Sequence, residues 1–344
     1  MLNTYGFHAE ALVTTNSPVN DKYQMFVDKL RTVRRHPLVS PARHSILNYL
    51  KWSGSIYSQN VPLLYLPGRG EASTQWAELA RDMRTKYQFY GSAYVLDHRG
   101  QGLSERLDPA RSDVGDIENF QDYVVDLREM IALIRRQNRG QKPLVVAHSM
   151  GAAILMKALM EEPDLVDKVA LITPMFDINF GPAEALGEGL AGAIIHTVAF
   201  FRPRLALSGK KGIVSVNDPE QVKTSDPVRA EVRWRLLQKY HAYMPKKTIR
   251  WVAENLKATK EILAGAHKVK TSVIMFAAEN DHVVELQRMI DISCQMPSCQ
   301  LKILPGAYHA AHEEIDQIRI PMLEDIANFF RGSPAEACDR LLTI

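Results

Sequence analysis

The chain has 344 residues, 46% of them hydrophobic, and its formal net charge at pH 7 is +3. A chain of this size can bury a large core, and a balanced charge without a basic stripe argues against nucleic acid as a partner. Three cysteines do not support a disulfide framework, and the first ten residues lack the basic start and apolar core of a signal peptide. We therefore expect a cytoplasmic protein.

The first sixty residues carry the weakest pattern of the chain. Residues 31–35 are basic, and residues 1–50 could form a helical extension that packs on the core. Residues 51–57 could form an early hairpin strand that leads into a sheet.

A glycine-rich loop follows the first buried strand. Residues 61–66 are apolar and predict that strand, and residues 67–71 read Pro-Gly-Arg-Gly-Glu. The loop lacks the Gly-Lys-Ser/Thr ending of a nucleotide loop and the third glycine of a dinucleotide fingerprint, so we do not expect nucleotide binding. Such a loop can bring a backbone N–H close to a substrate, and we assign the Arg69 amide to an oxyanion hole.

The loop at residues 97–104 combines charged residues with two glycines. Its residues do not have the number or spacing of zinc or calcium ligands, so we expect no metal there. We interpret it as a tightly hydrogen-bonded structural loop beside the active site.

Residues 147–151 read Ala-His-Ser-Met-Gly and follow an apolar run at residues 143–147. Residues 152–160 contain no helix breaker and predict a helix. A serine in a tight turn between a buried strand and a helix needs small neighbours two positions away, which Ala147 and Gly151 provide. The pattern predicts Ser149 as a nucleophile and the Met150 amide as the second oxyanion donor.

About a hundred residues separate the predicted strand at 168–173 from the next strand, which starts at residue 271. This length exceeds a simple crossover connection and predicts a helical cap over the strand ends. We therefore divide the chain into core residues 1–174, a cap at 175–266 and core residues 267–344. Alternating strand and helix patterns predict one α/β domain that carries this insertion.

The cap contains an apolar segment at residues 190–201, followed by Arg202, Arg204, Lys210 and Lys211. Twelve residues are too short to span a bilayer as a helix. We favour a cap helix buried against the core and the acyl pocket, because helices that are apolar all round are usually buried. The alternative is peripheral contact with the inner membrane, from which the cap would collect amphiphilic substrate.

An acid and a histidine are needed after the serine, since a hydroxyl is a poor nucleophile without a base. Asp281 follows the predicted strand at residues 271–278 and is the best acid candidate, with Glu279 as the alternative. His309 follows the predicted strand at residues 300–304 and is the best base candidate, with His312 as the alternative. His148 adjoins the nucleophile, and we expect it to pack against the turn.

Several motifs together resemble the lysophospholipase and monoacylglycerol lipase branch of the α/β hydrolases, a serine aminopeptidase-like family, and most of all its bacterial lysophospholipases. The resemblance covers about residues 63–330 and rests on the segments Leu66–Glu71, Leu96–Ser104, Gln121–Leu127, His148–Gly151, Pro174–Ile178, Thr224–Pro227 and Gly306–His309. Two positions depart from the usual family pattern, because Ala147 replaces a glycine and Ala310 stands where an acidic residue is common.

The resemblance implies an α/β-hydrolase fold with a mostly parallel sheet, flanking helices and a mobile helical cap. It implies hydrolysis of a lysophospholipid or monoacylglycerol ester by Ser149, Asp281 and His309, without a metal or organic cofactor. Rival hypotheses are a soluble carboxylesterase and a proline-type aminopeptidase, in which Glu184 and Glu188 could hold the free amine. A non-catalytic binding protein is a further alternative, although no member of the triad is missing.

Overall fold

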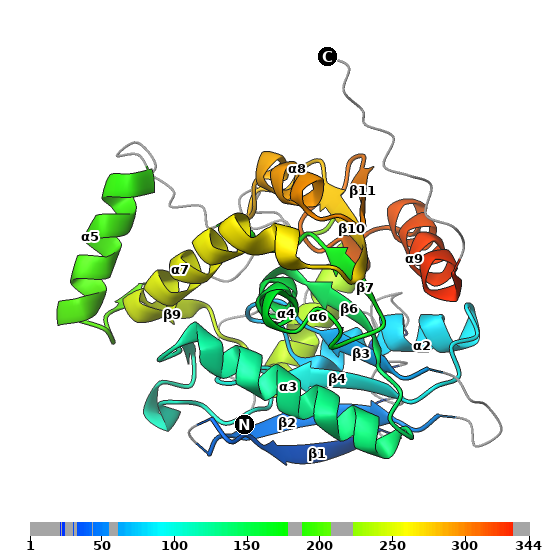
Figure 1. Cartoon of the computed structure of the whole chain (residues 1–344). Coiled ribbons are helices and arrows are strands. Elements are labelled where there is room, and N and C mark those ends of the chain that lie inside the picture. Colours follow the sequence, from blue (N-terminus) through cyan, green and yellow to red (C-terminus); the bar gives the residue numbers. More distant parts are fainter. Residues whose placement is uncertain are drawn as a thin grey trace.

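The computed structural model describes residues 21, 23–24, 30, 33–42, 44–54, 61–177, 188–207 and 223–332. Its centre is an eight-stranded sheet in the order β1-β2-β4-β3-β6-β7-β10-β11 (Figure 1). The strands from β4 to β11 run parallel, and β2 pairs antiparallel with both β1 and β4. The strand bounds are β1 Arg34–Val39, β2 Ile46–Trp52, β3 Leu63–Leu66, β4 Ala93–Asp97, β6 Leu144–His148, β7 Lys168–Ile172, β10 Ser272–Ala278 and β11 Cys299–Leu304.

Helices cover both faces of this sheet (Figure 1). Side chains from α3, α4, α7 and α8 form one apolar layer, and side chains from α2 and α9 form the other. The helices are α2 Ala77–Thr85, α3 Phe120–Gln137, α4 Ser149–Glu161, α5 Glu188–Phe201, α6 Pro227–Lys239, α7 Ile249–Gly265, α8 Leu286–Gln295 and α9 Asp316–Arg331.

Strand β6 shows why the central strands read as continuous apolar runs. Val145 and Ala147 pack in the layer of α3 and α4, whereas Leu144 and Val146 pack in the layer of α2 and α9. Successive residues of a strand point to opposite faces, so a strand covered on both sides must be apolar at every position. The strands predicted from such runs are confirmed as β3, β6, β7, β10 and β11, with ends within about two residues.

The N-terminal part of the core differs from the sequence interpretation. Residues 34–52 form the hairpin of β1 and β2, so the expected helical extension is wrong there. Cross-strand pairs stabilise this hairpin: Leu38 lies opposite Leu47, and His36 stacks on Tyr49 with ring centroids 5.1 Å apart. The expected strand at 51–57 starts too late, and its last three residues lie outside the described residues.

The segment assigned to the cap contains α5, α6, α7 and two short strands, β8 Ala206–Leu207 and β9 Lys246–Thr248. These strands form a small sheet with β5 Val114–Gly115. Helix α7 buries Trp251, Leu256 and Ile262 in the same apolar layer as α3 and α4. The segment 175–266 therefore includes one helix that packs into the core.

Helix α5 lies at the side of the molecule next to α7 (Figure 1), and its exposure contradicts the prediction that it is buried. Ala191 is buried, but Leu190 and Ile194 are about half exposed, and Phe200 and Phe201 are 81% and 74% exposed. A helix that is apolar on all sides can bury only the side that packs against a neighbour. Among the described residues that neighbour is mainly α7, and the buried residues Ala191 and Gly192 are small. Among the described residues, no helix is long and apolar enough to cross a membrane.

Candidate active site

Ser149 lies at the turn from β6 into α4, with a φ of +49°. L residues rarely adopt this left-handed conformation, so the turn is strained and needs close support. A Cβ on Gly151 would lie 2.5 Å from the carbonyl oxygen of Leu66 and 2.6 Å from that of Pro67, which explains why this position carries glycine. Ala147 is fully buried in the core, so its methyl group fits at the position for which the sequence predicts a small residue.

His309 joins Ser149 to Asp281. Its Nε2 lies 2.9 Å from the Ser149 Oγ, and its Nδ1 lies 2.8 Å from Asp281 Oδ2. A carboxylate can only accept, so Nδ1–H donates to Asp281 and leaves the lone pair of Nε2 to accept the serine proton. The structure thus brings together the three residues predicted as nucleophile, base and acid.

The loop after β10 holds Asp281 in place. Its Oδ1 accepts the backbone N–H groups of Val283 and Val284 at 2.8 and 3.1 Å. Burial raises the pKa of Asp281, but the hydrogen bond and charge of His309 outweigh burial, and the pKa lies below its usual value. The alternative acid, Glu279, instead accepts the backbone N–H of Gly306 at 2.8 Å.

His312, the alternative base, lies in a buried group with His148 and Glu71 behind the catalytic histidine. The Nδ1 of His148 lies 2.8 Å from Glu71 Oε1, and His312 Nε2 lies 3.9 Å from the same oxygen. The Nε2–H of His148 donates to the carbonyl oxygen of His309 at 3.0 Å, and Thr173 Oγ donates to that oxygen at 2.6 Å. His148 and Thr173 thus fix the backbone of His309.

Glu71, His148 and His312 are the group of described residues whose ligand atoms, within 4.8 Å of one another, could hold a metal ion. Glu71 also accepts the N–H of Gly68 at 2.7 Å and the indole N–H of Trp76 at 3.2 Å. Burial raises the pKa of Glu71, but the adjacent His148 outweighs this effect and holds it well below its ordinary value. We interpret the group as the support that links the glycine-rich loop to the base.

The glycine-rich loop lies directly against the nucleophile. A Cβ on Gly68 would be 2.7 Å from His148 Nδ1 and 3.1 Å from the Ser149 Cβ, so only glycine fits. The Arg69 N–H has no hydrogen-bond acceptor among the described residues. Met150 is the second residue of α4, where amides have no partner within the helix. These two amides are the donors that the sequence assigns to the oxyanion hole.

The loop at residues 97–104 is held by buried hydrogen bonds. Asp97 accepts the N–H and the hydroxyl of Ser73 at 2.6 and 2.7 Å, and burial raises its pKa to about 6. Arg99 forms two hydrogen bonds with the Asp126 carboxylate, at 2.6 and 3.0 Å. The structural role predicted for this loop is confirmed.

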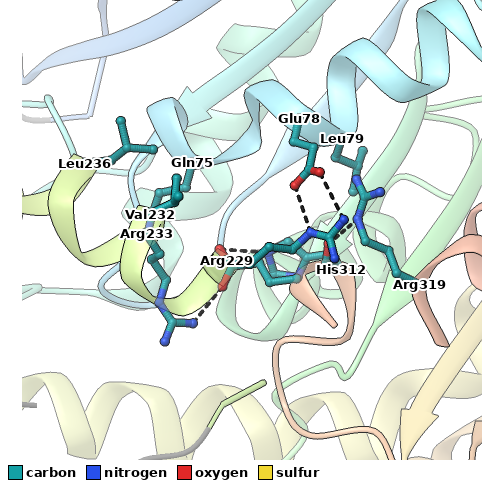
Figure 2. Close-up of a pocket in the computed structure, with 10 residues that line it drawn as sticks. Gln75, Glu78, Leu79, Arg229, Val232, Arg233, Leu236, His312 and Arg319 are labelled. Atoms are coloured by element: carbon teal, nitrogen blue, oxygen red, sulfur yellow. Dashed lines mark hydrogen bonds and ion pairs between the residues drawn. The ribbon is translucent and has the colours of Figure 1, made fainter. Parts of the chain in front are cut away.

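A small cavity of about 20 Å³ lies beside His312. Figure 2 shows the Glu78 carboxylate facing the Arg229 guanidinium there, and Arg229 Nε lies 3.0 Å from Glu78 Oε2. A space of this size holds about one water molecule, so it is not a substrate site. Its lining residues are Gln75, Glu78, Leu79, Arg229, Val232, Arg233, Leu236, His312, Glu313 and Arg319.

Comparison with known proteins identifies the family. Residues 60–316 match the family described as serine aminopeptidase, S33. The chain belongs to this family. It is 29% identical over 294 residues to lysophospholipase L2 of Escherichia coli, covering 77% of this chain and 78% of the relative. It is 24% identical over 279 residues to monoglyceride lipase of Rattus norvegicus, covering 80% and 84%. The resemblance found in the sequence motifs is confirmed.

Solved structures give the same fold. A soluble variant of monoglyceride lipase from Saccharomyces cerevisiae superposes with a TM-score of 0.65 at 16% identity, over 87% of this chain and 96% of the other. Monoacylglycerol lipase from Paleococcus ferrophilus superposes with a TM-score of 0.63 at 16% identity, over 82% and 98%. The family and these neighbours establish the α/β-hydrolase fold predicted from the sequence.

Sequence reasoning missed the group formed by Glu71, His148 and His312. Glu71 lies 77 positions before His148 (148 − 71), so no local pattern connects them. The one signal was the number of histidines and acids near the turn and the base loop. The adjacency of β3 and β6 in the sheet brings Glu71 to His148, and His312 comes from the loop after β11, at the far edge of the same sheet.

The buried environment predicts how His309 titrates. Burial lowers the pKa of its imidazole, and the Asp281 carboxylate raises it by less, so the net shift is downward. We expect an NMR titration of the His309 ring to have its midpoint below the ordinary value of about 6.5. Asp281→Asn should lower the midpoint further, and His309→Gln identifies the signal. A midpoint above 6.5 in the unmodified protein would contradict this account.

Proposed function

We propose that the protein is a serine hydrolase that cleaves carboxylic esters of lipid-like substrates, lysophospholipid or monoacylglycerol, through an acyl-enzyme on Ser149. The observation that carries the proposal is the hydrogen-bonded path from Asp281 through His309 to Ser149 at a strained turn. The relatives named lysophospholipase and monoglyceride lipase support a lipid ester as the substrate.

The proposed reaction uses each group for one task. Ser149 Oγ attacks the ester carbonyl while its proton passes to Nε2 of His309, and the Asp281 carboxylate stabilises the imidazolium that forms. The amides of Arg69 and Met150 donate to the oxyanion of the tetrahedral intermediate. His309 then gives its proton to the leaving alcohol. Water, deprotonated by His309, attacks the acyl-enzyme and releases the fatty acid and Ser149.

The rival functions have less support. Of the two acids that an aminopeptidase would use, Glu184 lies outside the described residues and Glu188 begins α5. A binding protein would not need the geometry that unites Ser149, His309 and Asp281. A soluble carboxylesterase would use the same triad, so only its substrate range distinguishes it.

Replacing the nucleophile tests the proposal. We expect Ser149→Ala to lower kcat for ester hydrolysis by roughly 10⁴ to 10⁶-fold, because the covalent step is lost while substrate binding remains. Fatty-acid release is measured from lysophosphatidylcholine, a monoacylglycerol and a short-chain nitrophenyl ester. Ser293→Ala, which removes a hydroxyl from α8, is the matched control and should retain activity.

Retained turnover in Ser149→Ala would refute the nucleophile. Activity of the unmodified protein on the nitrophenyl ester alone would instead favour a soluble carboxylesterase.

We also propose that α5 rests on an anionic lipid surface. Leu190, Ile194, Phe200 and Phe201 are exposed on or at the end of this helix, and Arg202 and Arg204 follow and are exposed as well. Apolar side chains beside cations are typical of segments that lie in the membrane interface. This arrangement supports the peripheral membrane contact considered from the sequence. Lys210 and Lys211 of the same interpretation lie outside the described residues.

The two phenylalanines at the end of α5 test this surface. We expect the double variant Phe200→Ser and Phe201→Ser to bind vesicles containing phosphatidylglycerol about 10-fold more weakly, because two apolar side chains no longer enter the interface. Co-sedimentation measures the binding, and Tyr90→Ser removes another exposed aromatic ring as the control. Equal binding by the double variant and the unmodified protein would exclude this surface.

A further inference from the structure

Three cationic side chains gather around the glycine-rich loop and the base loop. Arg69 belongs to the glycine-rich loop, and its guanidinium donates to the carbonyl oxygen of Lys246 at 2.7 Å. The Arg69 Cζ and the Lys247 Nζ lie 5.1 and 5.9 Å from the centre of the Trp251 ring. The carbonyl oxygen of Lys223 accepts the N–H of Ala310, the residue after His309, at 2.7 Å.

The charges of these side chains act on one another. Burial, and after it the positive charges of Arg69 and Lys223, together lower the pKa of Lys247 to about 8. Burial also lowers the pKa of Lys223; the charges of Arg233 and Arg69 lower it further, and those of Glu71 and Glu313 offset part of this shift. The charge of Lys223 in turn lowers the pKa of His309. The three cations therefore share one electrostatic environment that reaches the catalytic base.

No carboxylate of the described residues lies within 4.0 Å of the charged nitrogens of Arg69, Lys223 or Lys247. Neighbouring cations do have such partners: Lys246 pairs with Asp113 at 2.5 Å, Arg250 with Asp116 at 2.6 Å and Arg233 with Glu313 at 2.7 Å. Partly buried cations that repel one another are costly unless an anion joins them. The Nε of Arg69 is buried and has no hydrogen-bond acceptor, so the group retains donor capacity.

The position of this group relates it to the substrate. The backbone N–H of Arg69 is a proposed oxyanion donor, so the cations adjoin the site of the ester carbonyl. In a lysophospholipid, only the glycerol backbone separates the cleaved ester from a phosphate that is anionic at neutral pH. A monoacylglycerol has an uncharged hydroxyl group at that position, which gains far less from three cations.

We propose that Arg69, Lys223 and Lys247 form a phosphate subsite that favours lysophospholipids over monoacylglycerols. This inference rests on the proposed function of Ser149 and adds the chemistry of the head group. The phosphate binds by charge-assisted hydrogen bonds from Lys247, Lys223 and the free donor of Arg69. Trp251 holds the Arg69 and Lys247 side chains on the same ring.

The test compares two substrates on the same protein. We expect Lys247→Met and Lys223→Met each to lower the ratio of kcat/KM for lysophosphatidylcholine to kcat/KM for a monoacylglycerol by about 10-fold or more. Lys257→Met, which removes an exposed lysine from α7, loses the same charge and is the matched control. A ratio that stays within twofold of the unmodified protein in both subsite variants would overturn the proposal.

A binding assay separates the head group from other sources of phosphate. An alkyl-ether lysophospholipid and a 1-O-alkylglycerol, neither of which has a cleavable ester, compete with a short nitrophenyl ester. We expect the phospholipid ether to inhibit about 10-fold more strongly than the alkylglycerol, and this preference to disappear in Lys247→Met and Lys223→Met. Equal inhibition by both ethers would overturn the proposal that the subsite binds a phosphate head group. Inhibition by inorganic phosphate as strong as inhibition by the phospholipid ether would overturn it as well.

Failure of the proposed function gives a different result. In that case, the unmodified protein shows no Ser149-dependent release from any of the esters. If only the subsite proposal fails, Ser149-dependent hydrolysis remains, and the substrate ratio does not change in the lysine variants.

Discussion

The turn at Ser149 holds a residue with a side chain at a φ of +49°, and the surrounding structure is arranged to support it. Gly151 allows the carbonyl groups at the end of β3 to approach α4, and Gly68 allows the next loop to lie against the serine. Both contacts depend on β3 and β6 being adjacent parallel strands, because such strands end at the same edge of the sheet. The order of the central strands thus supports the strained turn at Ser149. The same order places the proposed oxyanion donors beside the nucleophile.

The other side of the site follows from the same sheet. Strands β7, β10 and β11 continue it away from β6, and the loops after β10 and β11 carry Asp281 and His309. Burial favours a neutral His309, which is the form a base requires, while Asp281 fixes the tautomer. His148 and Thr173 hold the carbonyl of His309, so the residue before the serine also helps to place its base. Separate contacts therefore fix the two parts of His309: His148 and Thr173 hold its backbone, and Asp281 sets the tautomer of its ring.

The sequence was informative where a local pattern fixes the structure. The apolar runs at β6, β10 and β11 gave the strands, and the order of serine, acid and histidine after them gave the three residues that the structure joins. Asp281 and Glu279 lie two positions apart, and the loop geometry brings only Asp281 to His309. The roles of Ser149 as nucleophile, His309 as base and Asp281 as acid are predictions that rest on these contacts.

Features set by distant parts of the chain were not predictable in this way. The composition of α5 indicates burial, yet the helix packs mainly against α7 in the described structure, and Phe200 faces water. The hairpin of β1 and β2 depends on pairs such as His36 with Tyr49, which no helical or strand period reveals. The group of Arg69, Lys223 and Lys247 forms only when three separate loops and strands meet. The local periodicity of the sequence does not predict such contacts between distant segments.

The central claim is that Ser149 is a nucleophile activated by His309. Covalent labelling with a fluorophosphonate, followed by peptide mass spectrometry, tests this claim most directly, because the reagent forms a stable adduct with an activated serine. The account predicts one adduct per chain, located on Ser149, and no adduct at that rate in His309→Ala. A chain that stays unlabelled, or that carries its adduct on another residue, would contradict it.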